Sequence, residues 1–216
     1  MKDNIQNKIL TISGEPASGK STVIKELVTN YETQGFKVHL ISVGELFREI
    51  ANEKGLSIQE FNEYMKNHDN VDKLIDNQIK QYGEKINSKI RPNDIYIFDS
   101  RLAWHNIPDS FAIRLIVKDE IAGKRVFNDK KRGKEDSYST LKEAIEETSK
   151  RKNAEIARYK QRYNIDLTNP NNYDLIIDTS YMDVPDISKT IIESEQKKSK
   201  HLPFKKIING IDLEIS

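Results

Sequence analysis

The stretch that decides the fold is Gly14-Glu15-Pro16-Ala17-Ser18-Gly19-Lys20-Ser21-Thr22, which matches the pattern G-x-x-x-x-G-K-[ST] in full. A β-branched apolar run, residues 8–13, precedes it, and residues 20–34 follow with apolar side chains at helical spacing. A turn of this kind directs backbone N–H groups and a helix N-terminus at an anion. The pattern therefore predicts a phosphate-binding loop. The plainer alternative is a glycine-containing turn at the start of a helix.

All nine residues of this loop are predicted to bind ATP. Lys20 is expected to reach the β- and γ-phosphates, and the Ser21 hydroxyl is expected to coordinate Mg²⁺. Glu15 places a negative charge beside the polyphosphate, so its side chain must point away or contact another group. Ala17 stands where related loops often carry glycine.

Outward from the loop, apolar runs and helical patterns alternate along the chain. Strands are predicted at residues 8–13, 37–43, 94–99, 112–117 and 174–178. Helices are predicted at residues 20–34, 44–54, 57–66, 71–89, 119–129, 140–162 and 184–196. Ser57 followed three residues later by Glu60 fits a capping box. The alternation predicts an α/β fold of the P-loop NTPase type, a five-stranded parallel sheet with helices on both faces.

Composition narrows the class of protein. The chain has 216 residues, 35 Lys plus Arg against 34 Asp plus Glu, and no Cys. The charge balance argues against a nucleic-acid partner, and the lack of a long apolar run argues against a membrane span. Without Cys, disulfides and thiolate catalysis are excluded. We expect a cytoplasmic monomer with one domain over residues 1–196, followed by a tail over 197–216 of unknown role. In that tail, Asn209-Gly210 is compatible with a small hairpin.

Two further features suggest function from the residues alone. Asp99 ends the apolar run 95–98, and an acid at the carboxyl end of a parallel strand is expected near a nucleotide site. It would hold Mg²⁺ through a water, or alternatively cap the next turn. Arg151, Glu155 and Arg158 share one helix face. Arginine suits phosphate because its planar fork binds two oxygens, although ordinary ion pairs on a solvated helix explain the same spacing.

With the loop in place, residues 8–192 resemble the nucleoside monophosphate kinases, and among them the shorter, archaeal type of cytidylate kinase. Three further segments carry the resemblance. They are residues 42–61, beginning Ser42-Val43-Gly44-Glu45-Leu46-Phe47-Arg48, then Asp99-Ser100-Arg101-Leu102-Ala103, and the region from Arg151 to Thr179.

The resemblance implies transfer of the γ-phosphate of MgATP to CMP or dCMP. It implies that Arg48 and Arg101, with Ser42, Gly44 and Asp99, bind the acceptor. It implies acceptor-binding helices over residues 44–90 and a lid over 125–140 that carries Arg125 and Arg132. It also implies that Arg151 and Arg158 bind phosphates while Glu155 helps to recognise the cytosine side. By the same resemblance, Lys20 and the arginines at 125, 132 and 151 would stabilise the transferring group.

The sequence is also compatible with two other functions. One is a kinase for another nucleotide or another small-molecule acceptor. The other is a nucleotide-binding regulator with impaired catalysis, which Glu15 and the lysine-rich lid suggest. A GTPase is disfavoured because no N-K-x-D tetrapeptide is present.

Overall fold

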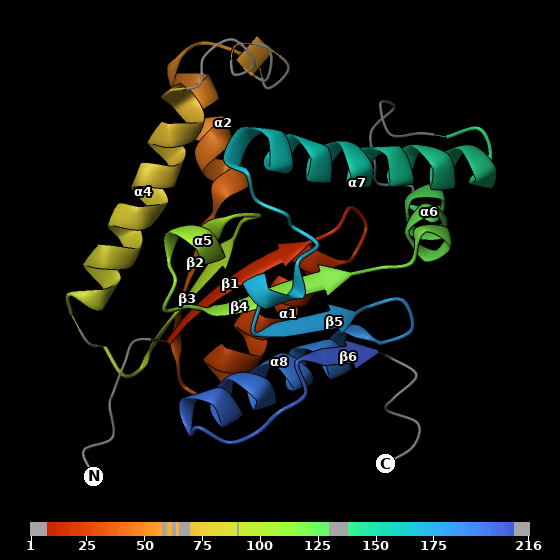
Figure 1. Ribbon diagram of the computed structural model, residues 1–216. Helices are drawn as coiled ribbons and strands as arrows, with labels where there is room; N and C mark the ends of the chain where they lie inside the picture. The colour runs from red at the N-terminus through yellow and green to blue at the C-terminus, as the bar shows by residue number, and fades with distance from the viewer. Residues whose placement is uncertain are drawn as a thin grey trace. The chain divides into compact units, whose positions relative to one another are not determined.

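The computed structural model describes residues 8–57, 60–61, 64, 70–89, 91–129 and 138–209, and it contains one sheet of six strands with helices around it (Figure 1). The strand order is β2-β3-β1-β4-β5-β6. The strands are β1 (Lys8–Gly14), β2 (Lys37–Ser42), β3 (Asp94–Asp99), β4 (Phe111–Ile116), β5 (Leu175–Asp178) and β6 (Ile207–Asn209). The pairs β1–β3, β2–β3, β4–β5 and β5–β6 are parallel. The predicted P-loop α/β class is therefore confirmed, and the predicted count of five strands is one short.

The additional strand comes from the tail to which the sequence assigned no role. β6 pairs with β5, with Ile207 beside Ile176 and Ile208 beside Ile177, and the side chain of Ile208 is buried. Asn209 belongs to this strand, and Gly210, its partner in the expected hairpin, lies outside the described residues. Three residues with two apolar positions are too short for periodicity to reveal, so only pairing to a neighbour defines β6.

The chain divides into two compact units. Unit 1 comprises Met1–Ile12 and Val28–Ala112, and unit 2 comprises Ser13–Leu27 and Ile113–Ser216. β1, helix α1 (Lys20–Thr33) and β4 contribute residues to both units. The phosphate-binding loop belongs to unit 2.

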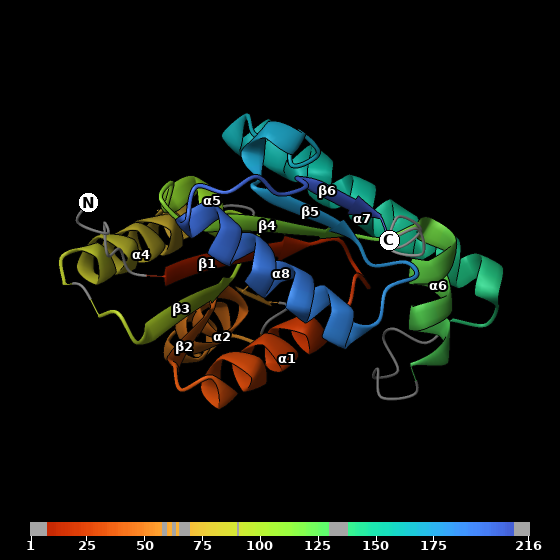
Figure 2. The same cartoon turned by 90° about the horizontal axis from the view of Figure 1, so that it is seen from below.

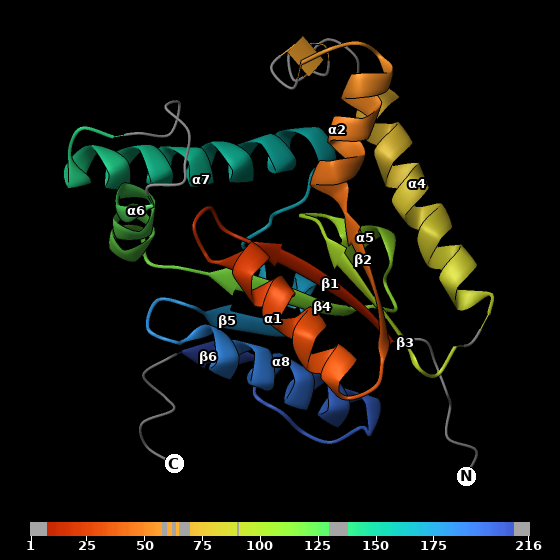
Figure 3. The ribbon, with the colours of Figure 1, turned by 180° about the vertical axis from the view of Figure 1, so that it is seen from behind.

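Unit 1 contains β2, β3 and the helices α2 (Val43–Glu53), α4 (Asn70–Asn87) and α5 (Ala103–Asn106). α2 and α4 lie side by side (Figure 3). Their apolar faces, together with Phe61 and the side chains of β1 and β3, form a core whose members are Ile9, Ala51, Phe61, Ile79, Ile86, Tyr96, Phe98, Ala103 and Ile107. In the sheet, Asp99 is aligned with Ile12 on one side and with Ser42 on the other. The carboxyl ends of these strands therefore lie together.

Unit 2 contains most of β4, the strands β5 and β6, and the helices α6 (Asp119–Asn128), α7 (Leu141–Tyr163) and α8 (Val184–Ser199), with a short 3₁₀ turn at Pro170–Asn172. α8 packs along β5 (Figure 2). α7 begins where the Thr140 hydroxyl accepts a hydrogen bond from the Glu143 N–H, and it ends at Asn164 in the left-handed region (φ +55°). A side-chain N-cap and a left-handed C-terminal residue are the usual ends of a long helix.

Apart from the short helix predicted over 57–66, the predicted elements correspond to observed ones within a few residues at each end. In the short helix predicted over 57–66, the capping box is present, because Glu60 Oε2 accepts from the Ser57 N–H at 2.8 Å and Ser57 Oγ accepts from the Glu60 N–H at 3.2 Å. These hydrogen bonds hold the pKa of Glu60 below its usual range. Residues 58–59, 62–63 and 65–69 lie outside the described residues, as do 130–137 of the predicted lid loop.

The contact between α6 and α7 depends on a glycine. A Cβ at Gly123 would lie 2.7 Å from Cα and 2.9 Å from N of Ile145, which are backbone atoms that cannot move away independently. We expect Gly123→Ala to lower the free energy of unfolding by about 1–3 kcal/mol, as overpacking does elsewhere. Urea unfolding measures this loss. Gly44→Ala is the control, since its Cβ would sit at ordinary distances of 3.7 Å from Ser42 Oγ and 3.8 Å from Arg48 Nη1. A Gly123→Ala protein as stable as wild type would contradict the close approach.

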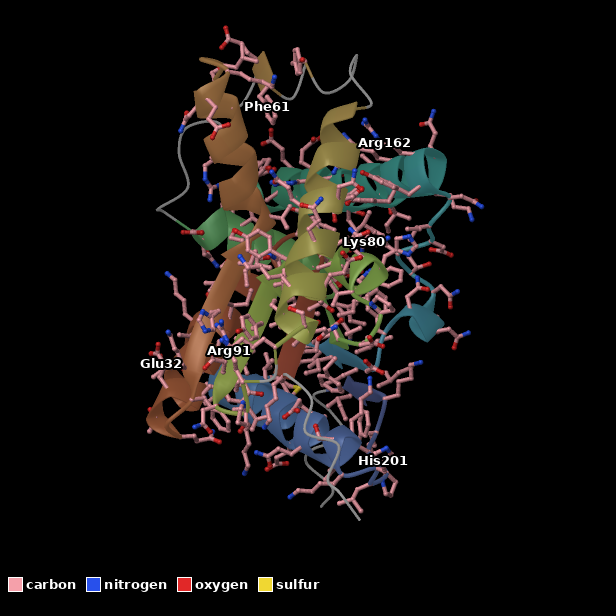
Figure 4. All side chains as sticks on the ribbon, turned by 90° about the vertical axis from the view of Figure 1, so that its left-hand side faces the viewer. Glu32, Phe61, Lys80, Arg91, Arg162 and His201 are labelled. Atoms are coloured by element: carbon pink, nitrogen blue, oxygen red, sulfur yellow. The ribbon has the colours of Figure 1, made fainter. Side chains whose placement is uncertain are left out.

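A polar cluster occupies the amino end of β3 in unit 1. Asp94 Oδ2 lies 2.9 Å from His39 Nε2 and 3.7 Å from Arg91 Nη1, and the His39 ring stacks on Tyr96 with centroids 4.7 Å apart. Figure 4 shows Arg91 near one end of this unit and Phe61 near the other. The hydrogen bond from His39, with its positive charge and that of Lys37, lowers the pKa of Asp94 against the opposing effect of burial.

The lowered pKa of Asp94 predicts a pH dependence of stability. A carboxyl whose pKa is lower in the folded than in the unfolded chain contributes stability that is present above the unfolded pKa and lost as pH falls through the folded value. We therefore expect Asp94→Asn to destabilise the protein at neutral pH and to flatten the acid side of the stability profile below about pH 4. Urea unfolding between pH 7 and pH 3 measures both effects. Asp109→Asn, in an exposed turn, controls for removal of a carboxyl, and the same flattening in that variant would count against the assignment.

Candidate functional site

The phosphate-binding loop runs from the end of β1 to the first turn of α1, as the sequence predicts. A Cβ at Gly14 would lie 2.6 Å from Ser18 Oγ, and Gly19 has φ +81°. Ala17 also lies in the left-handed region, with φ +61°, where a side chain costs about 1 kcal/mol relative to glycine. This left-handed backbone is the physical reason why related loops often carry glycine at the position of Ala17.

The loop fits a polyphosphate on structural grounds. Its backbone closes tightly on itself, since Ser18 N–H donates to the Glu15 carbonyl at 3.1 Å and Thr22 N–H to the Gly19 carbonyl at 2.9 Å. The Ser18 hydroxyl is buried and has no hydrogen-bond partner within the described part of the chain. It is a polar group inside the loop that a bound oxygen would satisfy. Lys20 and Ser21 open α1, and a helix N-terminus favours an anion.

The Glu15 carboxylate is held by cations of unit 2. Its Oε1 accepts from Arg114 Nη2 at 3.1 Å, and its Oε2 accepts from the Val117 N–H at 3.2 Å and lies 3.8 Å from Lys152 Nζ. The two side chains of the closer pair are nearly buried, with 12% of Glu15 and 8% of Arg114 exposed. The negative charge of Glu15 is therefore neutralised within the protein by Arg114 and Lys152.

Arg114 itself is fixed by further contacts. It projects from the buried strand β4 and donates to the Leu167 carbonyl and, at 3.3 Å, to the Tyr173 hydroxyl, and its guanidinium lies 5.5 Å from the centroid of the Tyr173 ring. The Tyr173 hydroxyl also donates to the Leu167 carbonyl, at 3.0 Å. One buried arginine thus ties the loop to the segment that leads from α7 into β5.

Two carbonyls of the loop are anchored from α6 and from the end of β5. Arg125 donates to the Ala17 carbonyl at 3.1 Å and to both the hydroxyl and the carbonyl of Thr179. The buried Thr179 hydroxyl donates to the Ser18 carbonyl at 2.9 Å. Burial lowers the pKa of Arg125, against the opposing charge of Asp178. The predicted lid residue Arg125 therefore has its guanidinium on the loop backbone.

The long helix α7 carries the predicted arginine face. Arg151 and Arg158 are exposed and Glu155 is half-buried, and the Arg158 guanidinium lies 5.1 Å from the centroid of the Tyr159 ring. A surface ion pair on this helix joins Lys150 to Glu147, at 2.6 Å, and involves neither of these arginines. Arg132, the second predicted lid arginine, lies outside the described residues.

The predicted acceptor residues belong to unit 1. Ser42 ends β2, Gly44 lies in the first turn of α2, and the exposed Arg48 lies one turn further. A Cβ at Gly44 would lie 3.7 Å from Ser42 Oγ and 3.8 Å from Arg48 Nη1, so the hydroxyl and the guanidinium both lie close to the first turn of α2. Asp99 is aligned with Ser42 across the sheet, and Arg101 follows it. This group of polar side chains at strand ends is where parallel sheets place ligands.

The sequence predicts that Ser21 and Asp99 hold Mg²⁺. Within the described ranges, no three His, Asp or Glu side chains are gathered as a metal site. Magnesium is commonly held by one or two protein oxygens together with phosphates and water. Ser21 lies in unit 2 and Asp99 in unit 1, so their pairing as ligands stays a prediction. Likewise, in the described part of the chain no helix has the length and apolarity that crossing a membrane requires.

Sequence reasoning missed Arg114 and Thr179, which hold the loop in place, and Lys152, which lies beside the Glu15 carboxylate. Arg114 carried a signal, since a charged residue in the middle of the apolar run 112–117 must find a buried partner. Thr179 follows a strand end as many polar residues do, and Lys152 is one of many lysines on a charged helix. Nothing in the spacing of these two indicates a contact with the loop.

Comparison with known proteins was consistent with this geometry. The model of the cytidylate kinase-like family matches residues 9–181. A cytidylate kinase of Methanocella arvoryzae is 35% identical over 192 residues, covering 89% of this chain and 99% of its own length. An S-adenosylmethionine-dependent nucleotide dehydratase of Lacinutrix mariniflava is 32% identical over 191 residues, which cover 88% of this chain and 36% of that protein.

A solved structure supports the fold. A protein from Eubacterium ventriosum superposes with a TM-score of 0.56 at 20% identity, covering 88% of this chain and 99% of the other. The family match spans most of the chain, including the loop, β3, α6, α7 and β5. The predicted family is confirmed: the chain belongs to the cytidylate kinase-like family and is an enzyme of the nucleoside monophosphate kinase class.

Proposed function

We propose that this protein transfers the γ-phosphate of MgATP to CMP or dCMP, giving ADP and the nucleoside diphosphate. The observation that carries the proposal is the closed loop Gly14–Thr22, with its tight backbone and the Ser18 hydroxyl turned inward. Lys20 and the N-terminus of α1 supply the positive charge that a polyphosphate requires. The cytidylate kinases among the relatives support cytosine as the acceptor base.

The acceptor is assigned to unit 1. Ser42, Gly44 and Arg48 supply a hydroxyl, a glycine in the first turn of a helix and a guanidinium, which together suit the phosphate of a nucleoside monophosphate. Asp99 and Arg101 belong to the same strand ends. On α7, Arg151 and Arg158 would contact phosphates and Glu155 the acceptor's base side. Mg²⁺ held by Ser21 and Asp99 would neutralise phosphate charge when bound.

The proposed phosphate transfer requires no other catalytic group from the protein. The acceptor phosphate is already an anionic nucleophile at neutral pH, so no strong general base is needed. Catalysis by placement and positive charge is the usual mode of phosphoryl transfer. In this scheme Lys20, Arg132 and Arg151 stabilise the transferring group, while Arg125 holds the loop backbone in the arrangement that the structure shows.

The second candidate is a kinase for a different nucleotide or small acceptor. The observation behind it is the relative from Lacinutrix mariniflava, which is a nucleotide dehydratase and not a kinase. The likeness covers only about a third of that protein, so no dehydratase activity is proposed for this chain. A nucleotide-binding regulator with impaired catalysis is less well supported, because Arg114 and Lys152 neutralise the charge of Glu15 on which that hypothesis partly rested.

An acceptor panel with a loop variant tests the proposal. ADP release in the presence of MgATP is measured with CMP, dCMP, UMP, AMP and GMP. We expect the highest kcat/KM with a cytosine nucleotide, and Lys20→Ala should lower kcat by about 100-fold or more because it removes a charge that stabilises the transition state. Lys25→Ala, an exposed lysine further along α1, is the matched control. A preference for another base would favour the second candidate, and no turnover with any acceptor would exclude a kinase acting on these monophosphates.

Arg48 tests the assignment of the acceptor to unit 1. Loss of a charge-assisted hydrogen bond to phosphate in Arg48→Ala should raise the acceptor KM by about 10- to 100-fold. The dissociation constant for ATP should change little, because the loop is built from other residues. Arg91→Ala is the control, since Arg91 lies at the amino end of β3, beside Asp94. If Arg48→Ala weakens ATP binding as much as acceptor binding, the division into donor and acceptor residues is wrong.

A further inference from the structure

The side chain of Lys152 connects three elements of unit 2. From α7 its Nζ bonds Asp119 Oδ1, in the first turn of α6, and lies 3.8 Å from Glu15 Oε2 in the phosphate-binding loop. Only 22% of the side chain is exposed, against 70% for its neighbour Lys150 on the same helix. A partly buried cation between two carboxylates constrains both partners more than a surface ion pair does.

The face of α7 that carries Lys152 is the face that packs on α6. Ile145, Ser149 and Lys152 recur at four and three residues, which places them on one side of the helix. The backbone of Ile145 meets Gly123, and Ser149 Oγ donates to Asp119 Oδ2 at 2.9 Å. Both bonds to Asp119 lower the pKa of its carboxyl, the one from Lys152 more than the one from Ser149. Asp119 is therefore an anion at neutral pH, at a helix N-terminus that favours one.

These contacts fix how α7 is rotated about its own axis. Arg151 is adjacent to Lys152 in the sequence and so projects about 100° away from it around the helix. When Lys152 is held on Asp119 and Glu15, the direction of Arg151 follows, and with it that of Arg158 two turns further. Glu15 retains its closer partner Arg114 regardless of Lys152, so the loop itself does not depend on this lysine.

We propose that Lys152 is a positioning residue, which through Asp119 and Glu15 sets the orientation of the arginine face of α7 for phosphate transfer. This inference rests on the proposed function, because Arg151 and Arg158 matter only if they contact phosphates. It differs from the roles assigned above, since Lys152 acts through its neighbours and contacts protein carboxylates rather than the substrates.

Kinetics of three variants test the proposal. In Lys152→Met, which keeps the length of the side chain without its charge, kcat should fall by about tenfold, as expected for a slight misplacement of catalytic groups. The dissociation constant for MgATP should stay within about threefold of wild type, because Arg114 still holds Glu15. Lys152→Arg should restore most of kcat. Lys150→Met, which removes an exposed lysine of the same helix, should match wild type.

Two results would overturn the role of Lys152. One is wild-type kcat in Lys152→Met. The other is an equal loss of kcat and ATP affinity together with a lower melting temperature, which would indicate a purely structural residue. Asp119→Asn combined with Lys152→Met should be no slower than the more affected single variant, because both act through one contact. Additive losses would contradict that shared contact.

Hydrogen exchange separates this inference from the proposed function. In Lys152→Met, backbone amides of residues 145–156 should exchange faster than in wild type, while those of α8 should not change. This measurement needs no acceptor. Faster exchange in α7 without turnover on any acceptor would refute the proposed function while supporting the positioning contact, and unchanged exchange would refute the contact whatever the activity.

Discussion

The ion pair between Glu15 and Arg114 is the contact on which the rest of the candidate donor site depends. A carboxylate and a guanidinium, both nearly buried, meet at 3.1 Å, and each has further partners to satisfy it. Removing one member of such a pair typically costs about 3–5 kcal/mol because the other is left as a buried, uncompensated charge. The pair therefore fixes the first residues of the loop to β4 and neutralises the negative charge of Glu15 within the protein.

The remaining anchors of the loop are hydrogen bonds to its carbonyls. Arg125 holds the Ala17 carbonyl and Thr179 holds the Ser18 carbonyl, so that an α-helix and a strand end support the same two residues. Ala17 adopts a left-handed backbone that alanine rarely takes, and its neighbours supply the energy that this requires. Because α6 also packs on α7 through Gly123 and Asp119, one short helix links the loop to the arginine-bearing helix.

Much of the architecture could be predicted because its signals are local. The P-loop pattern, the apolar strands and the helical spacing each depend on residues close in the sequence. They located each described strand and helix that is long enough to show a period. The sixth strand escaped because three residues carry no period of their own. In the same way, the sequence showed that Glu15 needed a contact, while the identity of that contact depended on Arg114, ninety-nine residues away. The residues of the acceptor group follow from the resemblance, and Arg132 lies outside the described residues.

The sequence by itself determined the class of the protein, since a glycine-lysine loop between an apolar strand and a helix has few other uses. It also determined where the loop begins and ends, because glycine and helix-start residues act over a few positions. Only the tertiary structure decided which cations surround Glu15, that the Arg125 guanidinium lies on the loop backbone, and that the tail supplies β6. The physical reason is range: backbone preferences and periodicity act between neighbours in the chain, whereas burial of a charge and completion of a sheet edge depend on residues that folding brings together.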